Sequence, residues 1–250
     1  MQISFFEEFP TKKNLDKLKL IKFPTKLYLA APSLQEFLKI KDKIKSGKIK
    51  EFVYWPIFSY QEGYWISPFT KRTALKRIFA ELKDKKISMM LDLELPTTKN
   101  FSLYFTQLFN FSRNKRLIKR FIGDYQGKVY LAEYFPISKY KLKLFNFLGL
   151  HYDYKKARVI KMLYHSMLPF SDNLFKEELR AGKQSFGKNY LAGFGTIAKG
   201  VMKWEPILSP GKLKTDLRLA KEVGVDEVVI FRLGGLDEKY IKIIKNFIKR

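Results

Sequence analysis

Short apolar runs alternate with longer amphipathic stretches along the whole chain. Eight runs of five to seven residues have the composition of buried strands, and each is followed by a stretch with helical spacing of its apolar positions. The expected strands are residues 2–7, 26–30, 51–55, 87–92, 128–133, 157–163, 189–194 and 226–231. The expected helices are residues 14–21, 33–47, 70–85, 99–122, 138–148, 172–181, 210–223 and a last one from 237.

This alternation indicates the fold class. Strands that each precede a helix pair in parallel, and eight such units in 250 residues favour closure into one (β/α)8 barrel domain spanning residues 1–250. The alternative is an open, doubly wound sheet of the dinucleotide-binding type. That alternative is less favoured because no G-x-G-x-x-G turn follows an early strand.

The composition indicates a cellular location and excludes some kinds of site. The chain has no cysteine, which excludes disulfides, thiolate metal sites and a cysteine nucleophile, and makes a cytoplasmic location the simpler expectation. The first residues lack the basic and long apolar segments of a signal peptide, and no apolar run reaches the roughly 18 residues of a membrane span. We therefore expect a soluble, unprocessed protein.

The formal net charge is +25, mostly from lysine. Such a charge attracts nucleic acid, anionic membranes or acidic polysaccharides. The lysines are spread over every expected helix, which is more typical of a solvated surface, and the sequence motifs of nucleic-acid-binding modules are absent. Nucleic acid is thus not the favoured partner, although the charge leaves it open, as it leaves open a non-catalytic binder of anionic polymer. The sequence gives no indication of oligomeric state.

The stretch ISMMLDLELP, residues 87–96, is an apolar strand that ends in two carboxylates. Because side chains alternate across a strand, Asp92 and Glu94 lie on one face together with Ser88 and Met90. Buried acids are rare unless they are paired or functional. This strand end therefore needs either a cationic partner or a chemical role.

In a (β/α)8 barrel, the active site lies at the carboxyl ends of the strands. These ends are rich in acids and aromatic residues. Glu7 and Glu8 both close the first strand, and alternation does not decide which of them points inward. The candidate site residues are Glu8, Trp55, Asp92, Glu94, Glu133, Tyr164, His165 and Arg232.

Paired carboxylates above a barrel suit glycoside hydrolysis, in which one acid protonates the leaving oxygen and another stabilises or attacks the sugar. Glu94 is the expected proton donor, and Asp92 would raise its proton affinity by repulsion between like charges. Glu133 is the candidate for a separate second carboxylate. The structural alternative is a buried ion-pair network in which Asp92 and Glu94 pair with Arg232 or Lys161.

Two motifs carry a resemblance to a known family. The strand ending LDLE resembles the D-x-E ending of family 18 glycoside hydrolases, the chitinase-like barrels, and is also similar to the carboxylate pair of family 25 lysozymes. The run Met162-Leu163-Tyr164 resembles the M-x-Y of the sixth chitinase-like strand, whose tyrosine contacts the N-acetyl group of the substrate. The resemblance implies a glycosidase-type barrel that acts on a carbohydrate without a cofactor.

Aromatic residues crowd the loop after the third strand, and another follows the seventh. Trp55, Trp65 and Trp204 are candidates for stacking against sugar rings, with Tyr60 and Tyr64 nearby. A hydrophobic cover over the barrel is the alternative.

Other assignments remain open for several residues. His165 is either a base or, more simply, a hydrogen-bonded structural residue. Lys161 on the sixth strand would serve a Schiff-base aldolase or lyase, and Asp92, Glu94 and Glu133 would supply an oxygen-rich Mg²⁺ or Mn²⁺ site. Gly234 and Gly235 precede a helix and would suit phosphate, although Asp237 reads better as the cap of that helix. No metal or cofactor is expected.

Overall fold

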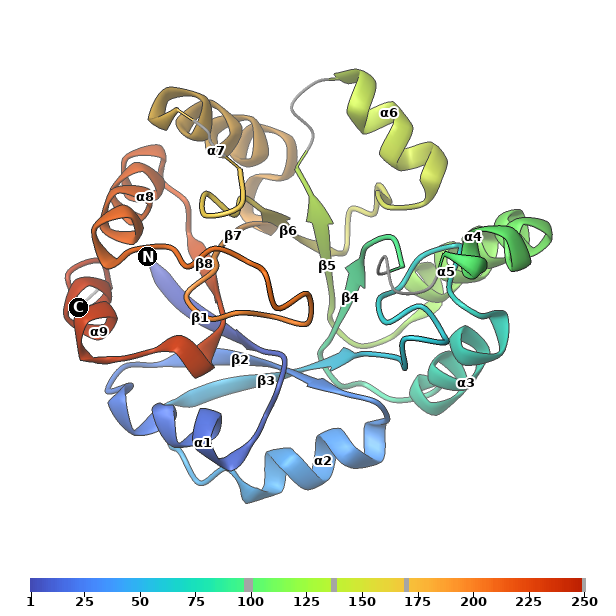
Figure 1. Cartoon of the computed structure of the whole chain (residues 1–250), viewed down its shortest axis with the longest axis horizontal. Helices are drawn as coiled ribbons and strands as arrows, with labels where there is room; N and C mark the ends of the chain where they lie inside the picture. Colours follow the sequence, from blue (N-terminus) through green and yellow to red (C-terminus); the bar gives the residue numbers. More distant parts are fainter. Residues whose placement is uncertain (97–100, 136–138, 169–170, 249–250) are drawn as a thin grey trace.

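Eight parallel strands close into a barrel in the computed structural model, which describes residues 1–96, 101–135, 139–168 and 171–248. Each strand pairs with the next along the chain, and β1 pairs with β8 to close the ring (Figure 1). The predicted (β/α)8 fold is confirmed. The strands are β1 (Gln2–Glu7), β2 (Thr25–Ala31), β3 (Ile49–Pro56), β4 (Met89–Leu93), β5 (Val129–Tyr134), β6 (Arg158–Met162), β7 (Tyr190–Gly195) and β8 (Glu227–Phe231).

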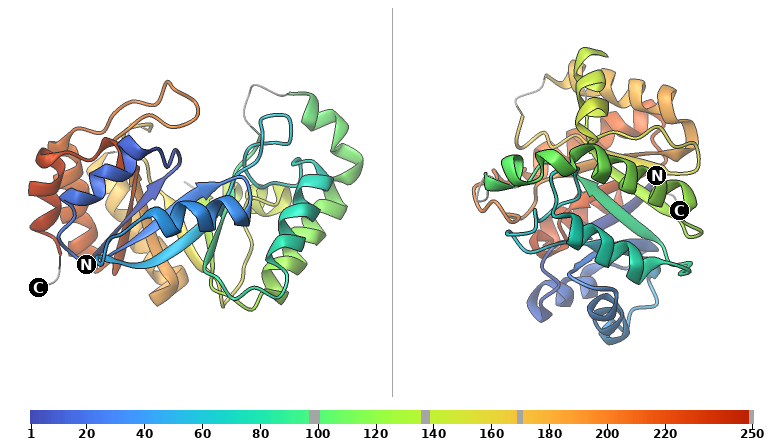
Figure 2. Two further views of the ribbon diagram at one scale, coloured as in Figure 1. Left: turned by 90° about the horizontal axis from the view of Figure 1, so that it is seen from below. Right: turned by 90° about the vertical axis from the view of Figure 1, so that its right-hand side faces the viewer.

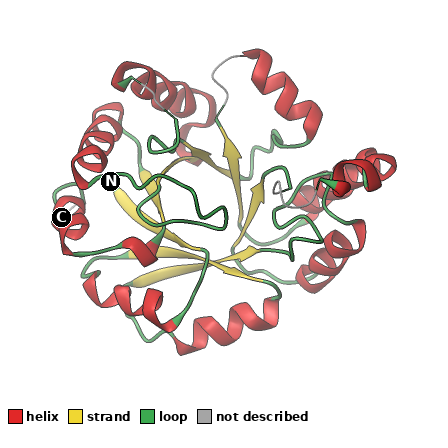
Figure 3. Cartoon of the chain, in the orientation of Figure 1, coloured by secondary structure: helices red, strands yellow, loops and turns green. Residues whose placement is uncertain are grey.

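The helices form a ring outside the strands (Figure 3). Their starts agree with local capping: the Ser33 hydroxyl accepts from the amide of Glu36, and Ser209 caps the helix that opens at Pro210. They are α1 (Lys12–Leu15), α2 (Leu34–Lys43), α3 (Arg72–Leu82), α4 (Ser102–Thr106), α5 (Phe111–Asp124), α6 (Lys139–Leu148), α7 (Asp172–Phe186), α8 (Pro210–Val223) and α9 (Glu238–Lys245). Within the described ranges, no helix is long and apolar enough to cross a membrane.

One predicted helix differs from the helices in the structure. Residues 99–122 were expected to form a single helix, but the described part divides into α4, a 3₁₀ turn at Leu108–Asn110 and α5. The first residues of that prediction, 99 and 100, lie outside the described residues. The sequence from 101 to 111 is dominated by Phe, Tyr, Thr and Asn, which have weaker helix propensity than the Lys, Arg and Leu that follow. The helix therefore breaks where propensity is lowest.

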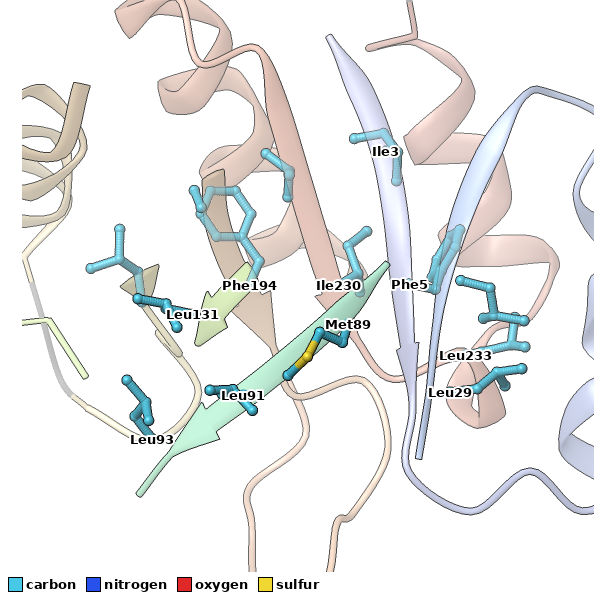
Figure 4. Packing of buried hydrophobic residues seen from close by; sticks show 14 of the residues in the cluster. Ile3, Phe5, Leu29, Met89, Leu91, Leu93, Leu131, Phe194, Ile230 and Leu233 are labelled. Carbon is cyan, nitrogen blue, oxygen red and sulfur yellow. The ribbon is translucent and has the colours of Figure 1, made fainter. Parts of the chain in front are cut away.

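The strands bury both faces, which creates two apolar layers. Met89, Leu91 and Leu93 point outward and pack against the helices together with residues such as Phe5 and Ile230 (Figure 4). Met90 points into the barrel, where it joins a second cluster of inward residues from every strand. Alternation along β4 therefore assigns Asp92, two residues after Met90, to the interior of the barrel.

The amino-terminal end of the barrel is closed by buried charge. Glu227 accepts hydrogen bonds from the hydroxyl of Ser4 and from Lys26 Nζ, both at 2.7 Å, and from Arg158 at 3.2 Å. Lysine and glutamate at the start of a strand are ordinarily solvated. Glu227 and Lys26 are instead buried and paired, because their long side chains, from the two strands that flank β1, meet inside the barrel.

Two long loops lie at the carboxyl-terminal end. Residues 57–71 connect β3 to α3, and residues 196–209 connect β7 to α8 and cross the barrel mouth (Figure 1). The second loop is fixed at its ends: the amide of Leu208 donates to the carbonyl of Thr196 at 2.7 Å, and that of Ile197 donates to the carbonyl of Phe231 at 2.7 Å. These loops build the walls of the site.

Candidate functional site

A cavity of about 500 Å³ opens at the carboxyl-terminal end of the barrel. Inward residues of the strands form its base, among them Phe6, Met90 and Phe231. Its size suits a small organic ligand or a few sugar rings. Four carboxylates line this otherwise mainly apolar space: Glu8, Asp92, Glu94 and Glu205.

Asp92 and Glu94 lie close together at the end of β4, where each carboxyl group affects the protonation of the other. Asp92 is buried, and its Oδ1 has no hydrogen-bond partner among the described residues. Burial, followed by the charge of Glu94 and the hydrogen bond with it, raises the pKa of Asp92 well above its ordinary value. Met90 lies beneath it in the strand and offers no polar group. The pair therefore holds a proton more tightly than an isolated carboxyl group does.

Glu94 is the outer member of the pair. The hydroxyl of Tyr134, at the end of β5, donates a short hydrogen bond to Glu94 Oε2. Burial raises the pKa of Glu94, and the hydrogen bonds from Tyr134 and Asp92 oppose that rise without cancelling it. A partly buried carboxyl with a raised pKa and a neighbouring proton has the properties of a general acid.

Tyr164 faces the same pair from the end of β6. It lines the cavity, and burial together with the charges of Asp92 and Glu94 raises the pKa of its phenol well above the ordinary value. The hydroxyl therefore stays protonated and can donate to an oxygen bound in front of the two acids.

Glu8 and Glu205 form the other acidic part of the cavity. Glu8 Oε1 accepts from the hydroxyl of Tyr64 at 2.8 Å, and Oε2 accepts from the amide of Val201 at 3.0 Å. Glu205 Oε1 accepts from the amide of Met202, whereas its buried Oε2 has no partner within the described part of the chain. A Cβ added at Gly200 would lie 2.9 Å from both carboxylates, so the loop approaches them at a residue without a side chain.

The pKa of Glu8 predicts a change of stability with pH. Burial raises it from the ordinary 4.5 to about 7, although the hydrogen bond from Tyr64 opposes the rise. The folded state holds the proton of Glu8 more tightly than the unfolded state does. The contribution of this group to stability is therefore fully present below about pH 4.5 and is lost as pH rises through about 7. We expect the free energy of unfolding of wild type, relative to Glu8→Gln, to fall by about 3 kcal/mol across this range in denaturant titrations.

A second variant checks the cause. Tyr64→Phe removes the hydrogen bond that favours the carboxylate, which raises the pKa of Glu8 in the folded state further, so the fall in stability should extend to higher pH. A difference between wild type and Glu8→Gln that stays flat from pH 4.5 to 7 would contradict the raised pKa.

Some of the candidate aromatic residues line the cavity, and others lie behind its wall. Trp55, Trp65 and Trp204 all line the cavity, and Trp204 is 59% exposed at its mouth. Tyr60 stacks on Tyr64 behind the wall, with ring centroids 5.4 Å apart. The loop is therefore partly wall and partly support.

Glu133 was expected in the cavity, and this placement is wrong. Its side chain lies on the helix-facing side of β5, where Oε2 accepts from Lys161 Nζ at 2.7 Å and lies 2.8 Å from His151 Nδ1. Lys161 Nζ also lies 5.5 Å from the ring centre of Phe186 in α7. The predicted Mg²⁺ or Mn²⁺ ligands therefore do not come together. Lys161 is likewise outside the cavity in which a Schiff-base lysine would act.

His165 and Arg232 also lie away from the cavity. His165 Nδ1 lies 2.9 Å from Asp216 Oδ1 and the ring stacks on Phe175, so its contacts are those of the structural alternative. Arg232 donates to Glu7 Oε1 at 3.0 Å and not to the Asp92–Glu94 pair. The ion-pair alternative for Asp92 and Glu94 is thus wrong.

The phosphate alternative at Gly234 and Gly235 is also contradicted. The amide of Gly234 donates to Glu7 Oε2 at 2.7 Å, and the Asp237 side chain caps α9 by accepting from the amide of Tyr240 at 3.0 Å. Glu7, not a phosphate, occupies this loop, and its outward position leaves Glu8 as the inward residue of the two.

No model of a known protein family and no curated protein sequence matches this chain. Several solved structures share its fold. A GH18 chitinase from Pseudoalteromonas aurantia has a TM-score of 0.58 at 8% identity, over 99% of this chain and 100% of that one. The PgaB (BpsB) glycoside hydrolase domain from Bordetella bronchiseptica has a TM-score of 0.54 at 10% identity, over 96% and 95% of the two chains. A xylose isomerase domain protein from Planctomyces limnophilus also reaches 0.54, at 12% identity, over 98% of this chain and 94% of that one.

At these identities the likeness establishes the barrel fold alone. Chitinase barrels, which the LDLE and MLY motifs resemble, are among the structures that share it.

Proposed function

We propose that this chain is a glycoside hydrolase in which Glu94 is the general acid. The observation that carries the proposal is the pair of neighbouring carboxyl groups, Asp92 and Glu94, which both have a raised pKa and line a cavity with tryptophan walls. Protonation of a glycosidic oxygen requires a carboxyl group that holds its proton beside aromatic side chains on which a sugar ring can stack.

Glu94 delivers the proton. As the bond between the anomeric carbon and the leaving oxygen breaks, the electron pair stays on that oxygen, which takes the proton of the Asp92–Glu94 pair from Glu94. Tyr134 holds the Glu94 carboxyl through its hydrogen bond, so the acid meets the leaving oxygen in a fixed orientation.

Asp92 and Tyr164 favour a 2-acetamido sugar as the substrate. The chitinase-like resemblance supports this assignment, since both residues occupy its motif positions. The acetamido oxygen would attack the anomeric carbon, with Asp92 accepting from the acetamido N–H and Tyr164 donating to its oxygen. Water then attacks the same carbon, and the bond between that carbon and the acetamido oxygen breaks with its electron pair returning to the acetamido group. The water gives a proton to the Glu94 carboxylate, which restores the acid.

Asp92→Asn tests this role. We expect activity on a panel of oligosaccharides and aryl glycosides to fall by about 10²-fold, because the amide cannot share a proton with Glu94. The matched control is Asp216→Asn, which changes a buried aspartate that pairs with His165 outside the cavity. That variant should lose stability but keep its rate per folded molecule. Activity should also persist in a chelator.

Cleavage that is equal in wild type and Asp92→Asn, or that needs added Mg²⁺ or Mn²⁺, would contradict the proposal. Trapping of a carbonyl substrate on Lys161 by borohydride would instead assign an aldolase.

A further inference from the structure

Large apolar side chains project into solvent from residues 101–110 and from α6. Phe105 is 76% exposed, Phe109 90% and Tyr140 83%. Where exposed apolar side chains gather on one side of a protein, they mark an interaction site. We use the term aromatic face for Phe105, Leu108, Phe109, Tyr140, Leu144 and Phe147.

The two stretches lie next to each other in the helical ring. The ring of Phe111 at the start of α5 lies 6.1 Å from that of Phe147 in α6, and Lys115 Nζ donates to the carbonyl of Asn146 at 2.6 Å. Figures 1 and 2 show this side of the barrel opposite α8 and α9. The aromatic face also adjoins the cavity, because Tyr104 of α4 lines the cavity one residue before Phe105.

The surrounding sequence is basic without interruption. Residues 95–123 contain six Lys and Arg and no Asp or Glu. Residues 134–152 contain three Lys and one His, and also no Asp or Glu. On α5 the side chains of Arg113, Arg116, Lys119 and Arg120 are exposed. These two segments therefore carry positive charge with no acid of their own to oppose it.

We propose that the aromatic face docks this protein on the surface of an anionic lipid bilayer. Phenylalanine and tyrosine side chains enter the boundary between headgroups and acyl chains, while neighbouring Lys and Arg bind lipid phosphates. A second copy fits less well, because a two-fold interface would bring these acid-free basic segments against each other. Docking here holds the cavity beside the membrane, whichever reaction the cavity performs.

Vesicle co-sedimentation tests the proposal. The full chain should bind vesicles containing phosphatidylglycerol in about 0.15 M salt, and should bind phosphatidylcholine vesicles weakly. Phe105→Ser/Phe109→Ser should weaken binding at least about tenfold. Arg116→Gln/Lys119→Gln should weaken it about 10- to 30-fold. All four side chains are exposed, so melting temperature should stay close to that of wild type.

Matched controls lie on α2. Leu38→Ser removes another exposed apolar residue, and Lys41→Gln/Lys43→Gln changes the net charge equally; both should bind like wild type. Equal loss in the α2 charge variant would overturn the proposal in favour of bulk charge. Absence of wild-type binding to anionic vesicles would also overturn it. So would a concentration-dependent dimer in sedimentation velocity that Phe105→Ser/Phe109→Ser abolishes, because a second copy would then cover the face.

Discussion

Glu94→Gln should lower turnover of substrates with poor leaving groups by about 10² to 10⁴, the usual contribution of general acid catalysis. The amide keeps the volume of the carboxyl and can still accept from Tyr134, but it has no proton to transfer. Aryl glycosides whose leaving groups need little protonation should lose much less. The measurement is kcat for a series of leaving groups, compared between wild type and variant.

Binding and stability separate a catalytic Glu94 from a structural one. Since burial raises the pKa of Glu94, replacing it with a neutral group removes an unfavourable buried charge, so melting temperature should stay equal or rise. The binding constant for a bound oligosaccharide should also stay nearly unchanged. A large drop in melting temperature with unaltered kcat would defeat the assignment of Glu94 as the acid. Tyr134→Phe is a useful second variant, because it removes the hydrogen bond that holds the Glu94 carboxyl group but leaves that group in place.

The strand order and the direction of Asp92 follow from the sequence for one physical reason. One face of β4 carries Met89, Leu91 and Leu93, whereas the other carries Met90 and then the acids Asp92 and Glu94. Alternation alone therefore separates the helix-facing side from the cavity side. The eight repeats of strand and helix leave few topologies other than the closed barrel. Both inferences need only local periodicity.

Glu133 was assigned to the wrong side of β5 because the two faces of this strand differ little in polarity. Its two faces are Val129-Leu131-Glu133 and Tyr130-Ala132-Tyr134, and both are largely apolar since a parallel barrel strand is buried on each side. The strand also continues one residue beyond the expected end. Tyr134, at this last position, therefore reaches Glu94 in place of Glu133.

Glu205 was missed for a different reason. It lies in the loop of residues 196–209, which has no periodicity to assign a direction, and it meets Glu8 only because the loop crosses the barrel mouth. Its Trp204 neighbour was the only cue in the sequence. Contacts between residues so far apart in the chain depend on tertiary folding, which local patterns do not encode.

Lys161→Met should lower the free energy of unfolding by about 3 to 5 kcal/mol, because it leaves a buried carboxylate without its cation. Lys161 and Glu133 are both buried and 2.7 Å apart on the helix-facing side of the barrel. Burial alone would raise the pKa of Glu133, but Lys161 and His151 outweigh it, and the pKa lies below its ordinary 4.5. The pair therefore stabilises the fold at neutral pH, and its contribution fades as pH falls below about 4.5.

Denaturant unfolding of Lys161→Met and of Lys128→Met gives the comparison. Lys128 is an exposed lysine just before β5 whose Nζ lies 3.4 Å from Glu51, so its loss should cost less than about 1 kcal/mol. Lys161→Met/Glu133→Leu should recover most of the loss, because no unpaired charge remains inside. Since both residues lie outside the cavity, kcat per folded molecule should change little in either variant. A Lys161→Met protein with wild-type stability and no turnover would place this lysine in the chemistry, and the proposed roles of Asp92 and Glu94 would then fail.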